Sequence, residues 1–284
     1  QHRGQEGAGI VTNDHGHLMG YRNRGLLADV FRKPEHLTQL TGDAAIGHVR
    51  YATAGSHGLE NIQPFLFDFA TDQFALAHNG NLTTAVTLRR MLEQSGAILK
   101  SSSDSEILMH LIRRAEGPDL HAQIKTALQQ IRGGFAYLLL TQDSLIAMLD
   151  PNGFRPLSIG RLANGGYVVA SETCALNTVQ ATFIRDVQPG EIVTIDADGL
   201  HSDFFTTETT HSICSMEYIY FARPDSDICG INVHEARKRM GKQLARETAV
   251  DADMVIGVPN SSLSAASGYA EESGLPYEMG LVKN

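Results

Sequence analysis

Short apolar runs closed by glycine, proline, asparagine or aspartate fill the first two-thirds of the chain, and this feature constrains the fold more than any other. Runs of this length between such turn residues predict β-strands. The predicted strands are 9–12, 45–51, 73–77, 135–141, 144–149, 166–171 and 191–195. Most follow one another without a helix between them, which predicts antiparallel sheets.

Three helices are predicted between groups of these strands. Thr83 can cap the first, Ser103 starts the second with Asp104 and Glu106 in its first turn, and the third begins near Asp119. Apolar residues at helical spacing predict three buried stripes: Ala85, Leu88, Met91 and Leu92; Ile107, Leu108, Leu111 and Ile112; Leu120, Ile124, Ala127, Leu128 and Ile131. Since the helices do not alternate with single strands, the predicted class is α+β.

The pattern changes after about residue 233. The predicted elements there are a helix with the apolar face Val233, Ala236, Met240 and Leu244, an apolar strand 254–258, a Ser/Ala-rich helix to Tyr269 and a strand near 278–282. Alternating helix and strand predicts the opening of a parallel α/β sheet. We place the boundary in the polar stretch near 221–232, which gives domains 1–221 and 222–284.

Charge and cysteine content exclude several classes of protein. The 284 residues carry 23 Lys+Arg against 32 Asp+Glu, a formal net charge of -9, and no basic cluster is visible, so nucleic-acid binding is disfavoured. The three cysteines match neither a disulfide framework nor a CxxC pair, which favours a reducing cytoplasm. No apolar run is long enough to span a membrane. The abrupt start at Gln1 is interpreted as that of a fragment.

Four polar segments, 1–6, 47–53, 77–81 and 102–106, contain the candidates for chemistry. Each has an ordinary structural alternative. Arg50 at a strand end could face solvent, Asn79-Gly80 could be a hairpin turn, and Asp104 could be a favourable charge at a helix N-terminus.

Taken together, the same residues suit a site for a free amino acid with a side-chain amide. Arg50 can pair with an α-carboxylate, and Asp104 can pair with an α-ammonium group. Attack on the amide creates an oxyanion, which the side-chain amide of Asn79 and the backbone N–H of Gly80 can stabilise. The predicted substrate is therefore glutamine.

These segments resemble the N-terminal-nucleophile glutaminase domain of amidophosphoribosyltransferases. The match continues through 150–157, 170–174, 189–191 and 212–226, and it covers essentially the whole chain. The resemblance implies a four-layer αββα sandwich over 1–221 that lacks its N-terminal cysteine strand. It implies that 222–284 begin an α/β phosphoribosyltransferase domain.

The resemblance also implies an activity. The family's nucleophile is an N-terminal cysteine whose own amine is the base, and it precedes Gln1, so this chain alone is expected to be inactive. Thr53 is implied in glutamine binding. The ammonia released displaces diphosphate from 5-phosphoribosyl 1-diphosphate and gives 5-phosphoribosylamine, the first committed step of de novo purine (IMP) biosynthesis. A homotetramer inhibited by purine nucleotides is implied.

Two cofactors follow from the same resemblance. The turn 257–262 resembles the first phosphate-contacting loop, with Ser261 at the position associated with Mg²⁺, although an ordinary helix cap is the alternative. Cys214 matches a ligand of a structural 4Fe-4S cluster whose three other ligands come later in the family's chains. A buried inert thiol is the alternative for Cys214, and Cys229 is interpreted as structural.

Two other functions remain open from the sequence. One is a different class II glutamine amidotransferase, of the glucosamine-6-phosphate synthase or asparagine synthetase type, which the segments 214–226 and 257–262 disfavour. The other is a non-catalytic regulatory module of the same fold. Retention of Arg50, Asn79, Gly80 and Asp104 favours the enzyme, since such a module has no need of oxyanion donors.

Overall fold

The computed structural model describes residues 1–51 and 58–283, so Thr53 of the predicted site lies outside the described residues. The chain packs as two compact units. The first contains Gln1–Arg155 and Val187–Ser212, and the second contains Pro156–Asp186 and Ile213–Asn284. The domain boundary at 221–222 is a division of the sequence and stays a prediction.

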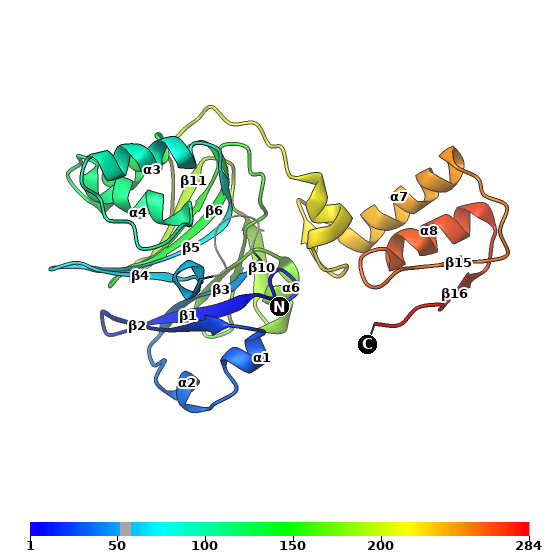
Figure 1. The fold of residues 1–284 in the computed structure, drawn as a ribbon, viewed down its shortest axis with the longest axis horizontal. Helices are drawn as coiled ribbons and strands as arrows, with labels where there is room; N and C mark the ends of the chain where they lie inside the picture. Colours follow the sequence, from blue (N-terminus) through cyan, green and yellow to red (C-terminus); the bar gives the residue numbers. More distant parts are fainter. Residues whose placement is uncertain (52–57, 284) are drawn as a thin grey trace. The chain divides into compact units, whose positions relative to one another are not determined.

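Two antiparallel sheets form the centre of the first unit (Figure 1). The smaller has the order β2-β1-β3, from β1 (Gly7–Asp14), β2 (His17–Arg24) and β3 (Ala44–Arg50). The larger has the order β12-β11-β7-β6-β5-β4, from β4 (Phe65–Asp68), β5 (Gln73–Leu82), β6 (Gly133–Leu140), β7 (Leu145–Leu149), β11 (Glu191–Asp196) and β12 (Gly199–Phe204). Every pairing in both sheets is antiparallel, as predicted.

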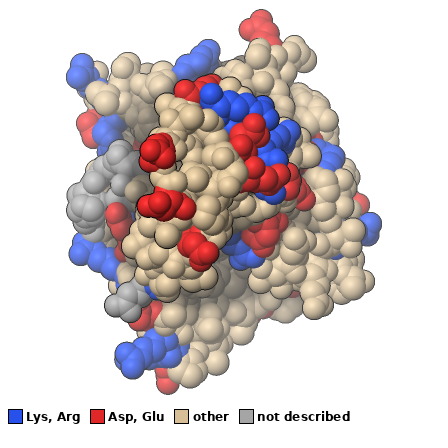
Figure 2. Space-filling model, turned by 90° about the vertical axis from the view of Figure 1, so that its right-hand side faces the viewer, with Lys and Arg blue, Asp and Glu red and all other residues tan. Residues whose placement is uncertain are grey.

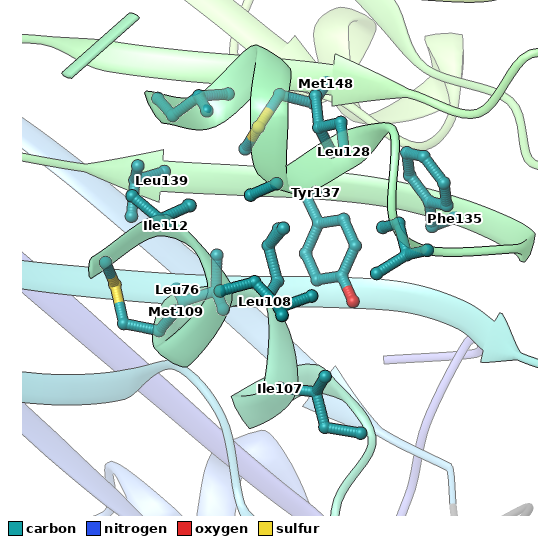
Figure 3. Close-up of a cluster of buried hydrophobic side chains, with 14 of the residues drawn as sticks. Leu76, Ile107, Leu108, Met109, Ile112, Leu128, Phe135, Tyr137, Leu139 and Met148 are labelled. Carbon is teal, nitrogen blue, oxygen red and sulfur yellow. The ribbon is translucent and has the colours of Figure 1, made fainter. Parts of the chain in front are cut away.

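Helices cover one face of the larger sheet. They are α3 (Ala85–Gln94), α4 (Ser105–Arg114) and α5 (Leu120–Leu128), and their apolar side chains bury Leu76, Phe135, Tyr137, Leu139 and Met148 of the strands (Figure 3). The opposite face packs on the smaller sheet through Ala75, Ala77 and Leu140 against Val11, Leu18 and Ile46. The short helices α1 (Leu27–Val30) and α2 (Glu35–Thr38) follow β2, and the rings of Phe31 and His36 pack on Tyr21. This order of layers confirms the αββα sandwich.

The predicted helix starts differ in reliability. Asp119 caps α5, because its carboxylate accepts the N–H of Ala122 at 2.8 Å. The stripe predicted for α4 is fully buried. The cap predicted for α3 is wrong: Thr84 precedes the helix, and its hydroxyl accepts the N–H of Arg132 instead of capping. Met91 of the α3 stripe is exposed.

The second unit combines a small sheet with two packed helices. Its sheet has the order β10-β8-β9, from β8 (Ser158–Arg161), β9 (Tyr167–Ala170) and β10 (Thr182–Asp186), with α6 (Thr173–Thr178) between β9 and β10. After the π-helical turn η2 (Glu217–Phe221) come β13 (Asp227–Ile228), β14 (Ile231–Asn232), α7 (Val233–Glu247), β15 (Val255–Ile256), α8 (Leu263–Ser273) and β16 (Tyr277–Glu278). The parallel pairing of β15 with β16 across α8 confirms the predicted start of an α/β sheet, although both strands are shorter than predicted.

The apolar face predicted for α7 is confirmed at Val233 and wrong at its two large residues, Met240 and Leu244. Its buried residues are Val233, Arg237, Gly241 and Ala245, whereas Met240 and Leu244 are exposed. The reason is the close crossing with α8. A Cβ on Gly241 would lie 1.8 Å from the carbonyl oxygen of a residue in α8, so only a small-residue ridge fits there and the large apolar residues point away.

The close crossing of α7 and α8 predicts that a larger residue at position 241 destabilises the protein. At an exposed helix position Gly→Ala stabilises, by about 1 kcal/mol. In Gly241→Ala we expect the added methyl to force the helices apart and to lower stability by roughly 1–3 kcal/mol. Hydrogen exchange of the α7 and α8 amides measures this, with Arg239→Ala on the exposed side as the control. Unchanged or increased protection in Gly241→Ala would contradict the close crossing.

Ion pairs join the exposed sides of the same two helices. Lys238 pairs with Glu271 at 2.6 Å, and Arg246 pairs with Glu272 at 2.8 Å. Figure 2 shows basic and acidic side chains interspersed on this face. Exposed pairs of this kind add little to stability, so the crossing depends mainly on the glycine contacts. No helix in the described part of the chain combines the length and apolar composition that crossing a bilayer requires.

Candidate active site

Asn79 and Gly80 lie inside strand β5, not in a turn. In the ladder with β6, Asn79 is opposite Ala136 and Gly80 is opposite Phe135. Gly80 has a φ of +153°, and a Cβ there would lie 2.1 Å from the carbonyl oxygen of Gly134. The hairpin alternative for these residues is therefore wrong, and the structure requires glycine at position 80.

The alternation of the ladder gives the direction of the Gly80 N–H. Both backbone groups of Phe135 are used toward β7, because its N–H donates to the Asp150 carboxylate at 3.0 Å and its carbonyl accepts the Asp150 N–H at 2.9 Å. A residue opposite such a position directs its own N–H away from the shared ladder. The N–H of Gly80 therefore points to the other edge of β5.

That edge carries a row of donors, two of which are occupied. The N–H of His78 donates to Gln63 Oε1 at 2.6 Å, and the N–H of Leu82 donates to Asp104 Oδ2 at 2.7 Å. Gly80 lies between them in the strand. The side-chain amide of Asn79 is half-buried and makes no hydrogen bond within residues 1–51 and 58–283. Two donors, one from a side chain and one from the backbone, thus occur at neighbouring residues.

Asp104 directly precedes α4 but does not cap it. Its carboxylate accepts no capping hydrogen bond from a backbone N–H of the helix and instead accepts the N–H of Leu82 in β5. Burial alone would raise the pKa of Asp104, but the imidazole of His78, 3.7 Å from Oδ1, and the N–H of Leu82 outweigh it and lower the pKa. Asp104 is therefore ionised at neutral pH. Its partners His78 and Leu82 hold it in place, so the alternative of a simple charge at a helix N-terminus does not describe it.

Arg50 is the last residue of β3 and is only 7% exposed, so the solvent-facing alternative is wrong. Two residues earlier, Nε2 of His48 lies 3.1 Å from the carbonyl oxygen of His78 and joins β3 to β5. Burial, with the nearby charges of His78 and Arg50, lowers the pKa of His48 to about 4, so His48 is neutral and Nε2 donates. This contact brings the strand that ends at Arg50 to the strand that carries Asn79.

The sequence did not predict the polar residues that hold this arrangement. His78 Nδ1 and Ser105 Oγ are 2.9 Å apart, and Ser105 Oγ also lies 3.4 Å from Asp104 Oδ1. The ring of His78 stacks on Tyr137, with the ring centroids 4.1 Å apart. The signals in the sequence were the adjacency of His78 to Asn79 and of Ser105 to Asp104, whereas Tyr137 is distant along the chain.

The buried carboxylate of Glu106 binds the loop that precedes α4. Its carboxylate is 1% exposed and accepts the N–H groups of Lys100 and Ser101, both at 2.8 Å, and the Ser101 hydroxyl at 2.7 Å. Burial would raise the pKa of Glu106, but hydrogen bonds from His110, Lys100 and Ser101 lower it to about 2. The loop that carries Asp104 is therefore wrapped around an ionised carboxylate.

Glu106 makes the stability of the first unit dependent on pH. Its pKa is lower in the folded than in the unfolded state, so the unfolded state binds the proton first as the pH falls. We expect this group's contribution, roughly 3 kcal/mol, to be present above about pH 5 and to be lost toward pH 2. Urea unfolding at several pH values measures it against Glu106→Gln, whose stability should fall less over this range. Equal slopes for the two proteins would contradict the prediction.

The predicted cofactor residues have different surroundings. Cys174 is buried, Cys214 is half-buried and Cys229 is exposed. No cluster of three or more metal-ligating side chains within the described residues includes Cys214. A 4Fe-4S cluster takes four thiolates, so Cys214 as a cluster ligand stays a prediction that needs three further ligands. Ser261 lies before α8, and Ser262, the residue at the helix start, donates to the carbonyl of Val258 rather than capping.

Comparison with known proteins identifies the class of the site. Residues 48–178 match the glutamine amidotransferase domain family. This range contains Arg50, Asn79, Gly80 and Asp104. The fold and the site therefore define a glutamine amidotransferase domain of the N-terminal-nucleophile type.

Whole-chain comparisons are more specific. The amidophosphoribosyltransferase of Staphylococcus epidermidis is 56% identical over 285 residues, which cover 100% of this chain and 58% of that relative. A structure described as the allosteric regulatory enzyme of purine biosynthesis superposes with a TM-score of 0.95 at 55% identity, over 100% of this chain and 61% of that one. Glutamine phosphoribosylpyrophosphate amidotransferase from B. subtilis, complexed with ADP and GMP, gives 0.94 at 54% identity, with the same coverage. The chain belongs to the amidophosphoribosyltransferase family.

Proposed function

We propose that the complete protein is an amidophosphoribosyltransferase. It hydrolyses glutamine and transfers the ammonia to 5-phosphoribosyl 1-diphosphate, with 5-phosphoribosylamine, glutamate and diphosphate as products. Its identity of 56% with a relative of that name supports this, although the chain spans only 58% of that relative's length. The observation that carries the proposal is the edge of β5, where Asp104 binds Leu82 N–H two residues beyond Gly80.

Each predicted residue has one role in glutamine hydrolysis. The guanidinium of Arg50 pairs with the α-carboxylate, and the ionised Asp104 pairs with the α-ammonium group. The Asn79 amide and the Gly80 N–H donate to the oxyanion that forms when the side-chain amide is attacked. Thr53, outside the described residues, is proposed to add a contact to glutamine.

The attacking group is proposed to be the terminal cysteine that the family uses. A terminal amine has an ordinary pKa of about 7.7–8.0, so it can take the thiol proton near neutral pH. Cys174, Cys214 and Cys229 are internal residues and have no free α-amine. None of these three thiols can therefore act as an N-terminal nucleophile.

The remaining assignments follow the family. Residues 1–221 are proposed as the glutaminase domain and 222–284 as the start of the phosphoribosyltransferase domain, with Ser261 near Mg²⁺ and the sugar diphosphate. Cys214 is proposed as one ligand of a 4Fe-4S cluster. We propose a cytoplasmic homotetramer inhibited by purine nucleotides; the ADP and GMP bound to the B. subtilis relative support the nucleotide binding in this proposal.

The test uses the product of the complete gene with glutamine, 5-phosphoribosyl 1-diphosphate and Mg²⁺. Glutamate and diphosphate should form in equal amounts, and ammonium chloride should replace glutamine as nitrogen donor. Release of glutamate without diphosphate would indicate another glutamine amidotransferase. Release of neither would contradict the proposal.

A further inference from the structure

One buried carboxamide ends the 3-10 helix η1 (Leu59–Asn61) and a second lies two residues later, and both bind the loop around Asp104. Asn61 is 2% exposed; its Oδ1 accepts the N–H of Ser102 at 3.0 Å, and its Nδ2 donates to the Ser102 hydroxyl at 3.0 Å. Gln63 is 7% exposed and donates from Nε2 to Ser105 Oγ at 3.2 Å. The two side chains thus hold this loop on both sides of Asp104.

Gln63 also holds β5, because its Oε1 accepts the N–H of His78 at 2.6 Å. This bond fixes the orientation of the amide. A backbone N–H can only donate, so the oxygen of Gln63 must face His78 and the nitrogen must face Ser105. The carboxamide accepts at one end and donates at the other, whereas an ionised glutamate can only accept and leucine can do neither.

The place of Gln63 on the strand explains why such a side chain is needed. Strand β4 pairs with β5 only along Gln73–Leu76. Beyond that point no strand among the described residues binds this edge of β5 at His78 or Leu82. The side chain of Gln63 accepts the N–H of His78, and that of Asp104 accepts the N–H of Leu82. The N–H of Gly80 is between these two bonds, so the same carboxamide fixes the strand that carries it and the helix start next to Asp104.

The segment that carries Gln63 is itself anchored. Nη1 of Arg22 in β2 donates to the carbonyl of Ile62 at 2.5 Å and to that of Pro64 at 3.2 Å. Burial lowers the pKa of this guanidinium, but Arg22 stays charged at any ordinary pH. The backbone on both sides of Gln63 is therefore held by a cation from the smaller sheet.

We propose that Gln63 is a positioning residue for glutamine hydrolysis, which sets the oxyanion donor at Gly80 at a fixed distance from the ammonium-binding carboxylate of Asp104. The inference rests on the proposed function. A displacement of about 1 Å between such groups can lower a rate by about 10²-fold, so a side chain that makes no contact with substrate can still have a large effect.

The experiment compares three variants of the complete gene product. Gln63→Leu should lower kcat/KM for glutamine by about 10²-fold, with kcat and KM both affected, because both links are lost. Gln63→Glu keeps the acceptor for His78 but loses the donor to Ser105, so we expect KM to rise by about tenfold with kcat close to wild type. Gln73→Leu is the matched control. Its carboxamide accepts the N–H of Leu18 at 2.9 Å at the opposite end of β5, and its glutamine kinetics should not change.

The rate with ammonium chloride separates positioning from folding, because ammonia does not use the glutamine site. All three variants should keep the wild-type rate with ammonia. Glutamine kinetics of Gln63→Leu within about twofold of wild type would overturn the inference, as would a parallel loss of the ammonia rate. If Gln63→Leu does not fold, unchanged KM in Gln63→Glu overturns it. A wild-type protein that does not hydrolyse glutamine refutes the proposed function instead.

Discussion

Asn79→Ala in the complete gene product should lower kcat for glutamine hydrolysis by about 10²–10³-fold, which corresponds to about 2.7–4 kcal/mol. The side-chain amide of Asn79 is half-buried and uncommitted within residues 1–51 and 58–283, so it is available to the oxyanion. Because the oxyanion exists only after attack, KM should change little, and kcat and kcat/KM should fall together. Steady-state release of glutamate measures all three.

The control for Asn79→Ala is two residues away on the same strand. Asn81 is exposed and lies on the same face of β5, so Asn81→Ala removes an equal side chain without removing the proposed donor. Its kcat should be that of the wild type, and both variants should keep the rate with ammonium chloride. An equal loss in the two variants would mean that Asn79 has no special role.

Gly80→Ala should abolish measurable glutamine hydrolysis and lower stability. A methyl group there would lie 2.1 Å from the Gly134 carbonyl oxygen and 2.7 Å from His78 Nε2, and the φ of +153° is strained for any L side chain. Strand β5 would have to move away from β6, which displaces the Gly80 N–H and the neighbouring Asn79. Glutamate release and thermal unfolding measure the two effects.

Gly199→Ala is the control that distinguishes backbone strain from the steric clash expected in Gly80→Ala. Gly199 also has a positive φ, +118°, but no atom lies within 4 Å of a Cβ built there. This variant should lose only the conformational term, about 1–2 kcal/mol, and keep its glutamine kinetics. If Gly80→Ala were no worse than Gly199→Ala, the close approach at β5 would have no functional consequence.

Local signals in the sequence predicted much of the fold. The helix start near Asp119 and the stripe Ile107, Leu108, Leu111 and Ile112 are properties of a few adjacent residues, and both are confirmed. The strands β2, β4, β8, β10 and β12 were not predicted. In β10 the adjacent residues Phe183 and Ile184 are both exposed, so no alternation marks the strand.

The failures share a physical cause, since they depend on contacts between distant residues. The face of α7 is set by how closely Gly241 lets α8 approach, and apolar spacing within α7 carries no information about that distance. In the candidate site, the segments of Arg50, Asn79 and Asp104 were predicted to meet from the chemistry of a free amino acid. Gln63 was missed because its partners His78 and Ser105 are 15 and 42 positions away.

A crystal structure of the complete gene product with L-glutamate, the product of hydrolysis, tests the central claim most directly. We expect the α-carboxylate on the guanidinium of Arg50 and the α-ammonium group on Asp104. One side-chain oxygen should lie about 3 Å from the Asn79 amide and from the Gly80 N–H. Glutamate bound on another surface, or Arg50 and Asp104 turned to separate cavities, would contradict it.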